Sequence, residues 1–360
     1  MSAIHHFVPV VHRGDAVGRH TLRLRDATRA RGFESNIYVD TIEAETANET
    51  IPVVDFPDRA QAGDVAVYQF ATASAMAPWL AARPETLVVN YHNITPPDLL
   101  APWDNHLALG QLRAQAELRL LAPRTALAVA DSLYNRGHLV EAGFAHCAVV
   151  PPSAALSDDV IGPGARSAPA ARAMGTGARW LSVGRVAPNK AVEHTIAALM
   201  VARAHHDPEA TLLIIGKPAT ASYDQALHRY VAELGLTAAV TFGGHASDAT
   251  VAEAYRQADV LVVMSEHEGF CVPVTEAMRV GLPVVAFDQG ALPEVLGKAG
   301  VFVESQDPYR VAATVGALLA DAPRRARLAH AAVQQLRELA LDSAAERFVD
   351  LLCTVAERAS

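Results

Sequence analysis

An alternation of apolar, strand-like runs with helical stretches is the feature that most constrains the fold of this chain. In the first half, apolar runs at 64–70 and 86–91 are followed by helical stretches, of which 105–122 is among the clearest. The alternation starts again at 179 and continues through the second half. Strands that alternate with helices favour a parallel sheet with helices on both faces. The sequence therefore predicts an α/β protein with two Rossmann-like, doubly wound parallel sheets, in domains that face a cleft.

An irregular segment separates the two runs. Residues 153–178 are rich in Ala, Gly, Pro and Ser and lack periodicity, which indicates a linker or an exposed loop. We predict a first domain over 1–155, a linker over 156–177 and a second domain over 178–342. The tail has a helical apolar face, and we expect residues from about 343 to 360 to pack back on the first domain.

Composition excludes several classes of protein. The chain has 360 residues, of which 51% are hydrophobic, so it can bury two cores of ordinary size. The net charge of −9 argues against a general nucleic-acid binder, although it leaves open a local phosphate pocket or a weak membrane-facing patch. No apolar run approaches the ~18 residues that span a bilayer, and the N-terminus does not have the pattern of a signal peptide.

Cysteine and histidine usage points to a reducing compartment and to no metal. The three cysteines have neither zinc spacing nor the pattern of a disulfide framework, so we expect a cytoplasmic protein. The histidines are scattered, and no Asp-x-Asp stands in the predicted strand-exit loops. We therefore expect no metal and no cofactor.

Two glutamates mark a candidate binding loop in the second half. In SEHEGFCVPVTEAM (265–278), Glu268 follows a buried strand and Glu276 lies in the first turns of the next helix. Ligands of open α/β sheets bind at this carboxyl edge of the strands. A helix N-terminus there offers free N–H groups to phosphate. The alternative is that both glutamates are solvated acids at a helix start, where they complement the helix dipole.

Two cations follow the first strand of the second half. In LSVGRVAPNK (181–190), Arg185 and Lys190 lie at the carboxyl edge of that strand. An arginine can grip a phosphate with two parallel hydrogen bonds, and a lysine supplies a point charge. Such a clamp would stabilise the charge that develops on a diphosphate leaving group. Taken alone, the pair is better interpreted as two solvated loop cations, and the glutamate loop later in the same domain is what favours the clamp.

These motifs resemble those of the retaining glycosyltransferases of family four, which have the GT-B fold, in the group similar to glycogen synthase and phosphatidylinositol mannosyltransferase. The match is strong over 181–296 and looser in the first half. It includes the G-x-P-V-V-A pattern that starts at Gly281 and the G-x-x-P-E-V pattern that starts at Gly290. The resemblance implies an N-terminal acceptor-binding domain and a C-terminal domain that binds the nucleotide-sugar donor.

The resemblance assigns roles to residues of the second domain. Glu276 would bind the ribose hydroxyls and Glu268 the hydroxyls of the transferred sugar, while Arg185 and Lys190 would hold the diphosphate. The other implied donor contacts are the backbone N–H groups of Gly269, Phe270, Cys271 and Val272, the base-cupping residues Gly244 and His245, and Lys217.

In the first domain, the segment HRGDAVGRHT (12–21) resembles the family's glycine-rich loop in a GDAxG form. Gly14 and Gly18 would permit a tight turn near phosphates. Asp15 either contacts a substrate or caps the following helix. Arg19 is a candidate acceptor contact.

His92 ends a strand, and the resemblance implies that it lies beside the transferred sugar, as a catalytic residue. Ser132 is either a helix cap or a ligand contact. The remaining candidates for the acceptor pocket are Asn93, Thr95 and Trp103.

The resemblance implies a retaining, metal-independent transfer of a sugar from a UDP- or GDP-linked donor to an acceptor hydroxyl of a glycan, a lipid-linked sugar or a small molecule. Two alternatives keep the same fold: a nucleotide-sugar epimerase, and a non-catalytic partner that binds a sugar nucleotide. A nicotinamide dehydrogenase is disfavoured, because no strand is followed by the glycine fingerprint and a ribose-binding acid.

Overall fold

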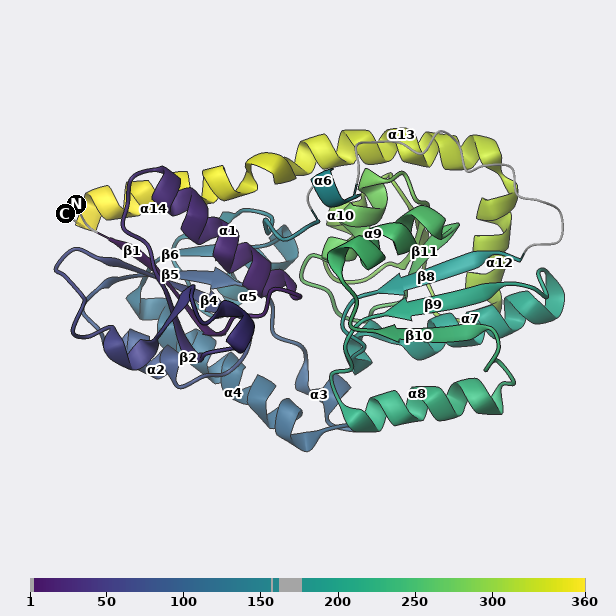
Figure 1. Ribbon diagram of the computed structural model, residues 1–360, viewed down its shortest axis with the longest axis horizontal. Helices are drawn as coiled ribbons and strands as arrows, with labels where there is room; N and C mark the ends of the chain where they lie inside the picture. The colour runs from purple at the N-terminus through teal and green to yellow at the C-terminus, as the bar shows by residue number, and fades with distance from the viewer. Residues whose placement is uncertain (1–2, 157, 162–176, 360) are drawn as a thin grey trace. The chain divides into compact units, whose positions relative to one another are not determined.

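A computed structural model describes residues 3–156, 158–161 and 177–359, which form two compact units (Figure 1). The first unit contains Met1–Pro97, His106–Ala154 and Ala340–Ser360, and the second contains Asp98–Asn105 and Ala155–Leu339. The segment 98–105, which the sequence analysis assigns to the first domain, therefore belongs to the second unit. Of the expected linker, residues 157 and 162–176 lie outside the described residues.

The first unit is built on a parallel sheet of seven strands in the order β3-β2-β1-β4-β5-β6-β7. The strands are β1 (Ile4–Val10), β2 (Ile37–Thr41), β3 (Thr50–Pro52), β4 (Val65–Phe70), β5 (Thr86–Tyr91), β6 (Thr125–Ala130) and β7 (Cys147–Val149). The longer helices of this unit are α1 (Ala16–Ala30), α4 (Asn105–Leu121), α5 (Leu133–Glu141) and α14 (Ala344–Ala359), with the short helix α2 (Met76–Ala81); the short helix α3 (Pro97–Leu100) lies in the second unit except for Pro97. α3 and α4 each run across a boundary between the two units.

Both faces of this sheet are buried, which explains the continuous apolar runs in the sequence. In β4, Val65 and Val67 belong to one core cluster, whereas Tyr68 and Phe70 belong to another. Successive side chains of a strand point to opposite faces, so each face receives its own core. The cluster around Val65 also contains Phe348 and other residues of α14, and α14 contacts α1, β4 and β5.

The second unit has a parallel sheet of six strands in the order β10-β9-β8-β11-β12-β13. Its strands are β8 (Arg179–Val183), β9 (Thr211–Ile215), β10 (Val240–Gly244), β11 (Val260–Val263), β12 (Val284–Phe287) and β13 (Val301–Val303). Its helices are α6 (Asp158–Ile161), α7 (Val192–His205), α8 (Ala221–Glu233), α9 (Asp248–Gln257), α10 (Val272–Arg279), α11 (Leu292–Leu296), α12 (Pro308–Ala320) and α13 (Ala322–Leu339).

The strand order of the second unit fixes where its loops meet. β8 and β11 are neighbours although 76 residues separate their ends at Val183 and Val260. The crossover places their carboxyl ends at the same edge, beside the point at which the strand order reverses. In open α/β sheets this switch point is the usual ligand site. The expectation of two doubly wound parallel sheets is confirmed.

Candidate functional site

The basic loop after β8 and the first glutamate of the later motif meet at this switch point. Lys190 Nζ lies 2.6 Å from Glu268 Oε1, and the hydroxyl of Ser265 donates to the same oxygen over 2.8 Å. The Glu268 side chain is only 6% exposed and that of Lys190 26%. A carboxylate this buried requires a paired cation and hydrogen bonds. The arrangement is a partly buried ion pair at the strand edge.

Asn189 joins the two loops that carry this ion pair. Its side-chain amide donates to the backbone oxygen of His267 over 3.2 Å, and its own backbone oxygen accepts from the N–H of Glu266 over 2.9 Å. Asn189 is buried. Sequence reasoning missed Asn189 and Ser265, although both stand inside the motifs. The bonds of Asn189 depend on a partner loop that only the crossover brings near, whereas Ser265 bonds to Glu268 within its own loop.

Positive φ angles mark the loops of the predicted site. Among the described residues, the non-glycine residues with positive φ are Ala340 and three that follow strands: Asn93 at 82°, Ala191 at 47° and Cys271 at 73°. This conformation is sparsely populated for such side chains and concentrates where surrounding structure imposes it for function. Ala191 follows Lys190, and Cys271 precedes α10.

Cys271 lies at the N-terminus of α10, among the N–H groups expected to serve the sugar and phosphates. Gly269, Phe270 and Val272 complete this turn, and all four residues are buried. Burial raises the pKa of the Cys271 thiol well above its usual range, and the neighbouring Glu268 adds to the effect. The thiol therefore stays neutral at physiological pH. It adds no negative charge to a turn expected to face phosphate.

Glu276 is held from two sides inside the second unit. The hydroxyl of Tyr255 donates to its Oε2 over 2.8 Å, and the N–H of Leu156 donates to its Oε1 over 2.9 Å. Glu276 is 3% exposed and Tyr255 is fully buried. Neither donor was anticipated from the sequence, because Tyr255 stands in no recognisable site motif and Leu156 contributes only its backbone.

Two glycines permit close approaches of backbone around the site. A Cβ at Gly290 would lie 2.6 Å from the backbone oxygen of Glu268, and the next N–H, of Ala291, donates to that oxygen over 2.9 Å. The G-x-x-P-E segment thus packs against the backbone of the Glu268 loop and holds it in place. A Cβ at Gly216 would lie 1.7 Å from the oxygen of Gly184, which keeps the loops after β8 and β9 in contact.

The predicted base-binding residues lie on neighbouring strand exits. Lys217 follows β9, is exposed, and its backbone oxygen accepts from the N–H of Val186 over 3.0 Å. Gly244 ends β10 with φ at 58°, and its oxygen accepts from the N–H of Gly216 over 2.9 Å. His245 follows and is exposed. These backbone bonds tie the exits of β8, β9 and β10 into one edge.

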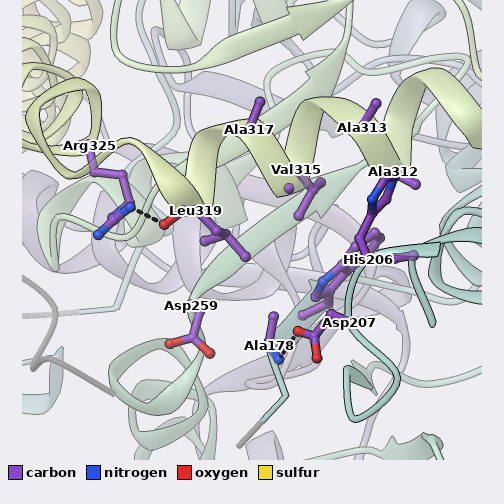
Figure 2. A pocket seen from close by; sticks show the side chains of 13 residues that line it. Ala178, His206, Asp207, Asp259, Ala312, Ala313, Val315, Ala317, Leu319 and Arg325 are labelled. Carbon is purple, nitrogen blue, oxygen red and sulfur yellow. Dashed lines mark hydrogen bonds between the residues drawn. The ribbon is translucent and has the colours of Figure 1, made fainter. Parts of the chain in front are cut away.

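The second unit also has a cavity far from this edge. It has a volume of about 590 Å³, and α12 and the residues just before β8 and β11 contribute to its lining (Figure 2). Two carboxylates stand on its wall: Asp207 accepts from the N–H of Ala178 over 2.6 Å, and Asp259 accepts from the N–H of Arg179 over 2.8 Å. Because these residues precede the strands, the cavity lies at the amino edge. Arg185, Lys190 and Glu268 instead line a small cavity of about 20 Å³ at the carboxyl edge.

In the first unit, the glycine-rich segment begins a helix. Asp15 Oδ1 accepts from the N–H of Gly18 over 2.6 Å and caps α1. A Cβ at Gly18 would lie 2.0 Å from the oxygen of His12, so only glycine permits this approach. Gly14 is exposed in the turn before the cap. Arg19 donates through Nε to the oxygen of Ala154 over 2.8 Å, at the end of the unit's second segment.

His92 is part of a buried polar network. Its Nδ1 lies 3.1 Å from Asp131 Oδ2 and its Nε2 lies 2.8 Å from Gln69 Oε1. The side chains of His92 and Asp131 are 4% and 6% exposed. Asn90 connects Gln69 to His20, with 2.8 Å on each side. Burial, with a contribution from His92, lowers the pKa of His20 well below its usual range.

The candidate acceptor residues fall into different places. Asn93 and Thr95 follow β5, and the N–H of Thr95 donates to Gln111 Oε1 over 3.1 Å. Ser132 accepts from the N–H of Asn135 over 3.0 Å and caps α5. Trp103 belongs to the second unit, where its ring packs edge-on against Tyr223 with centroids 4.9 Å apart. Each unit thus assembles its own subset of the predicted site residues.

The described part of the chain has neither a cluster of metal ligands nor a helix of membrane-spanning character. Across 3–156, 158–161 and 177–359, no group of three or more His, Cys, Asp or Glu side chains could hold a metal ion. In the same ranges, no helix is long and apolar enough to cross a membrane.

Known proteins resemble this chain in sequence, and the match to a protein family lies in the second unit. Residues 171–335 match the family described as glycosyl transferases group 1. A D-inositol 3-phosphate glycosyltransferase of Thermomonospora curvata is 34% identical over 181 residues, which cover 48% of this chain and 41% of that protein. The D-inositol 3-phosphate glycosyltransferase of Corynebacterium urealyticum is 29% identical over a region that covers 76% of this chain and 69% of that protein. An MMP alpha-(1->4)-mannosyltransferase of Mycolicibacterium hassiacum is 35% identical over 39% of this chain and 33% of its own length. The chain spans less than half the length of the first curated relatives that it matches: 41% of the Thermomonospora curvata protein, and 35% and 36% of the D-inositol 3-phosphate glycosyltransferases of Stackebrandtia nassauensis and Salinispora tropica.

Solved structures resemble the whole chain. The Anabaena protein HepE in complex with UDP and glucose has a TM-score of 0.76 at 16% identity, with 98% of this chain and 100% of that chain covered. Sucrose-phosphate synthase from Thermosynechococcus elongatus has a TM-score of 0.77 at 18% identity, with 99% of both chains covered. At this level of identity the likeness establishes the fold, which is GT-B.

Proposed function

We propose that this chain, whose residues 171–335 belong to the group 1 glycosyl transferases, is a glycosyltransferase that moves a sugar from a nucleotide-diphosphate donor to an acceptor hydroxyl. The observation that carries the proposal is the Lys190–Glu268 ion pair beside Arg185 at the switch point of the second sheet. That edge combines hydroxyl acceptors with cations. A sugar nucleotide needs both.

The donor would lie along the carboxyl edge of the second sheet. Glu276 accepts hydrogen bonds from the ribose hydroxyls and Glu268 from those of the transferred sugar. Backbone N–H groups from Gly269 to Val272, at the N-terminus of α10, meet the sugar and the phosphates. His245 and Gly244 cup the base. Backbone hydrogen bonds hold the loops after β8, β9 and β10 together at one edge of the sheet, which supports this placement.

The leaving group would take its stabilisation from Arg185, Lys190 and the positive end of α10. As the bond between the anomeric carbon and the diphosphate oxygen breaks, negative charge grows on that oxygen, and fixed cations lower its energy. The acceptor hydroxyl attacks from the same face and gives its proton to the departing phosphate oxygen. The new bond thus has the anomeric configuration of the donor. No metal is required, since the cations supply the charge.

The names of relatives and of a structural neighbour support a proposal for the class of donor. Relatives are named for transfer to D-inositol 3-phosphate and for mannosyl transfer, and a structural neighbour is a complex with UDP and glucose. We propose a UDP- or GDP-linked hexose as donor and a hydroxyl of a glycan, a lipid-linked sugar or a small molecule as acceptor. The reaction would take place in the cytoplasm, where sugar nucleotides are available and the cysteines stay reduced.

A panel of UDP- and GDP-sugars tests the proposal. We expect one donor to be hydrolysed slowly to free nucleoside diphosphate and sugar, and to raise the melting temperature of the protein. An epimerised sugar nucleotide as product would indicate the epimerase. Thermal protection without turnover, with and without acceptors, would indicate the non-catalytic binder. No turnover and no protection by any member of the panel would refute the proposal.

A further inference from the structure

We propose that Tyr255 is a positioning residue that orients the Glu276 carboxylate and thereby sets the preference of the donor site for ribose over 2′-deoxyribose. The inference rests on the proposed function, since it concerns the nucleotide half of the same site. It adds a residue from α9, outside the two-glutamate motif, to the machinery of donor recognition.

The geometry around Glu276 holds the carboxylate from two sides. Tyr255 Oη donates to Oε2 over 2.8 Å and the Leu156 N–H donates to Oε1 over 2.9 Å. One hydrogen bond to each oxygen fixes the plane of the carboxylate, and with it the directions of all its lone pairs. The two vicinal hydroxyl groups of a ribose require two acceptors in a fixed relation. An oriented carboxylate provides them.

Tyr255 is built to hold its position. Its side chain is fully buried, and its phenol ring has only two rotatable bonds, so the hydroxyl cannot swing away without disturbing the core. The next residue, Arg256, donates through Nη1 to the oxygen of Ile161 at the end of α6 over 3.2 Å. Ser247 caps the start of the same helix, α9, by accepting from the N–H of Thr250. The helix that carries Tyr255 is therefore fixed at both ends.

A purely structural role makes a different prediction. If Tyr255 only satisfied a buried carboxylate, removing its hydroxyl would lower the stability of the protein and weaken all nucleotides equally. If Tyr255 orients the carboxylate, removing its hydroxyl should weaken the binding of ribonucleotides more than that of 2′-deoxyribonucleotides. A site built to bind a hydroxyl rejects an analogue without it, because the acceptor is then left unsatisfied.

The test compares binding of UDP and GDP with that of their 2′-deoxy forms by calorimetry, in the unmodified chain, in Tyr255→Phe and in Tyr223→Phe. Tyr223 is the matched control: it is buried in the same unit, and its hydroxyl accepts from the N–H of Val192 and donates to Glu193. We expect the unmodified chain and Tyr223→Phe to prefer the ribose form by about tenfold or more. In Tyr255→Phe the preference should fall to about threefold or less, mainly through weaker binding of the ribose form.

The possible results distinguish a failure of the proposed function from a failure of the inference about Tyr255. Failure of the unmodified chain to bind either ribonucleotide would overturn the proposed function, and this inference with it. Binding with a preference that Tyr255→Phe leaves intact would overturn the inference alone. If Tyr255→Phe does not fold, Tyr255→Gln is measured instead, because an amide donor can satisfy the buried carboxylate without holding it where the phenol hydroxyl does. An unchanged ribose preference there refutes the inference, and a lost preference supports it.

Discussion

Removal of the Lys190 ammonium should separate the structural role of the ion pair from its catalytic role. Lys190→Ala removes one of the two side-chain partners described for Glu268 Oε1. The carboxylate stays buried and charged, and of those two partners the Ser265 hydroxyl remains. Breaking a fully buried pair costs about 3–5 kcal/mol, but the Lys190 side chain is 26% exposed and one hydrogen bond survives. We therefore expect a loss of about 2–3 kcal/mol in the free energy of unfolding. For a domain of this size the melting temperature should fall by roughly 4–12 °C.

The loss of turnover should be larger than the loss of stability explains, and restoring the stability should not restore the turnover. Loss of one fixed cation at a developing phosphate charge should lower turnover by about 100-fold. The double variant Lys190→Ala, Glu268→Gln removes the stranded charge, so it should recover most of the lost stability while turnover stays low. Thermal unfolding and donor hydrolysis are measured on both variants and on Lys298→Ala, an exposed lysine of the same unit. A Lys190→Ala variant as stable as the Lys298→Ala control, with no recovery in the double variant, would refute the reasoning.

Four further outcomes are expected. Arg185→Ala should lower turnover by about 100-fold with little change in melting temperature, because the residue is exposed; a change below about threefold removes it from the site. Glu276→Ala should chiefly weaken binding of the free nucleoside diphosphate, which calorimetry would contradict if the affinity were unchanged. Gly290→Ala, at φ 61° and 2.6 Å from the Glu268 oxygen, should cost about 1–3 kcal/mol and lower turnover; an equally active and stable variant would show that the loop yields without cost. Burial lowers the pKa of His6 to about 3 and that of His20 well below its usual range. The unfolded chain therefore binds protons below about pH 6.5 that the folded chain does not, so the contribution of these histidines should be constant above neutrality and stability should fall below pH 6.5, by about 1.4 kcal/mol per pH unit toward pH 4 from His6 and further from His20. A melting temperature that stays level between pH 7 and pH 5 would contradict this.

The layout of strands and helices follows from local patterns. Both faces of each sheet are buried, so runs such as 65–68 and Val260–Val263 are continuously apolar and are followed by helical stretches. The strand β3 (Thr50–Pro52) is not expected from the sequence, because three residues are too few for a periodic signal. Local patterns place segment 98–105 with the first domain, whereas its contacts group it with the second unit. Nothing local reveals that Trp103 packs on Tyr223, 120 residues later.

The motifs themselves determined which residues of the second unit stand at strand exits. Loops that follow parallel strands lie at one edge, so the sequence alone is enough to expect Arg185, Lys190 and Glu268 near each other. The order β8-β11, which makes those two exits adjacent, is a property of the crossovers alone. So are the bonds from Asn189 and Tyr255, because each joins residues far apart in the chain that only packing brings within 3.2 Å, whereas Ser265 bonds to Glu268 within its own loop. The kind of chemistry at the site could be predicted from the sequence, because it depends on which residue types stand at the strand ends. The orientation of each charged group could not be predicted, because it depends on neighbours that only the tertiary structure brings into contact.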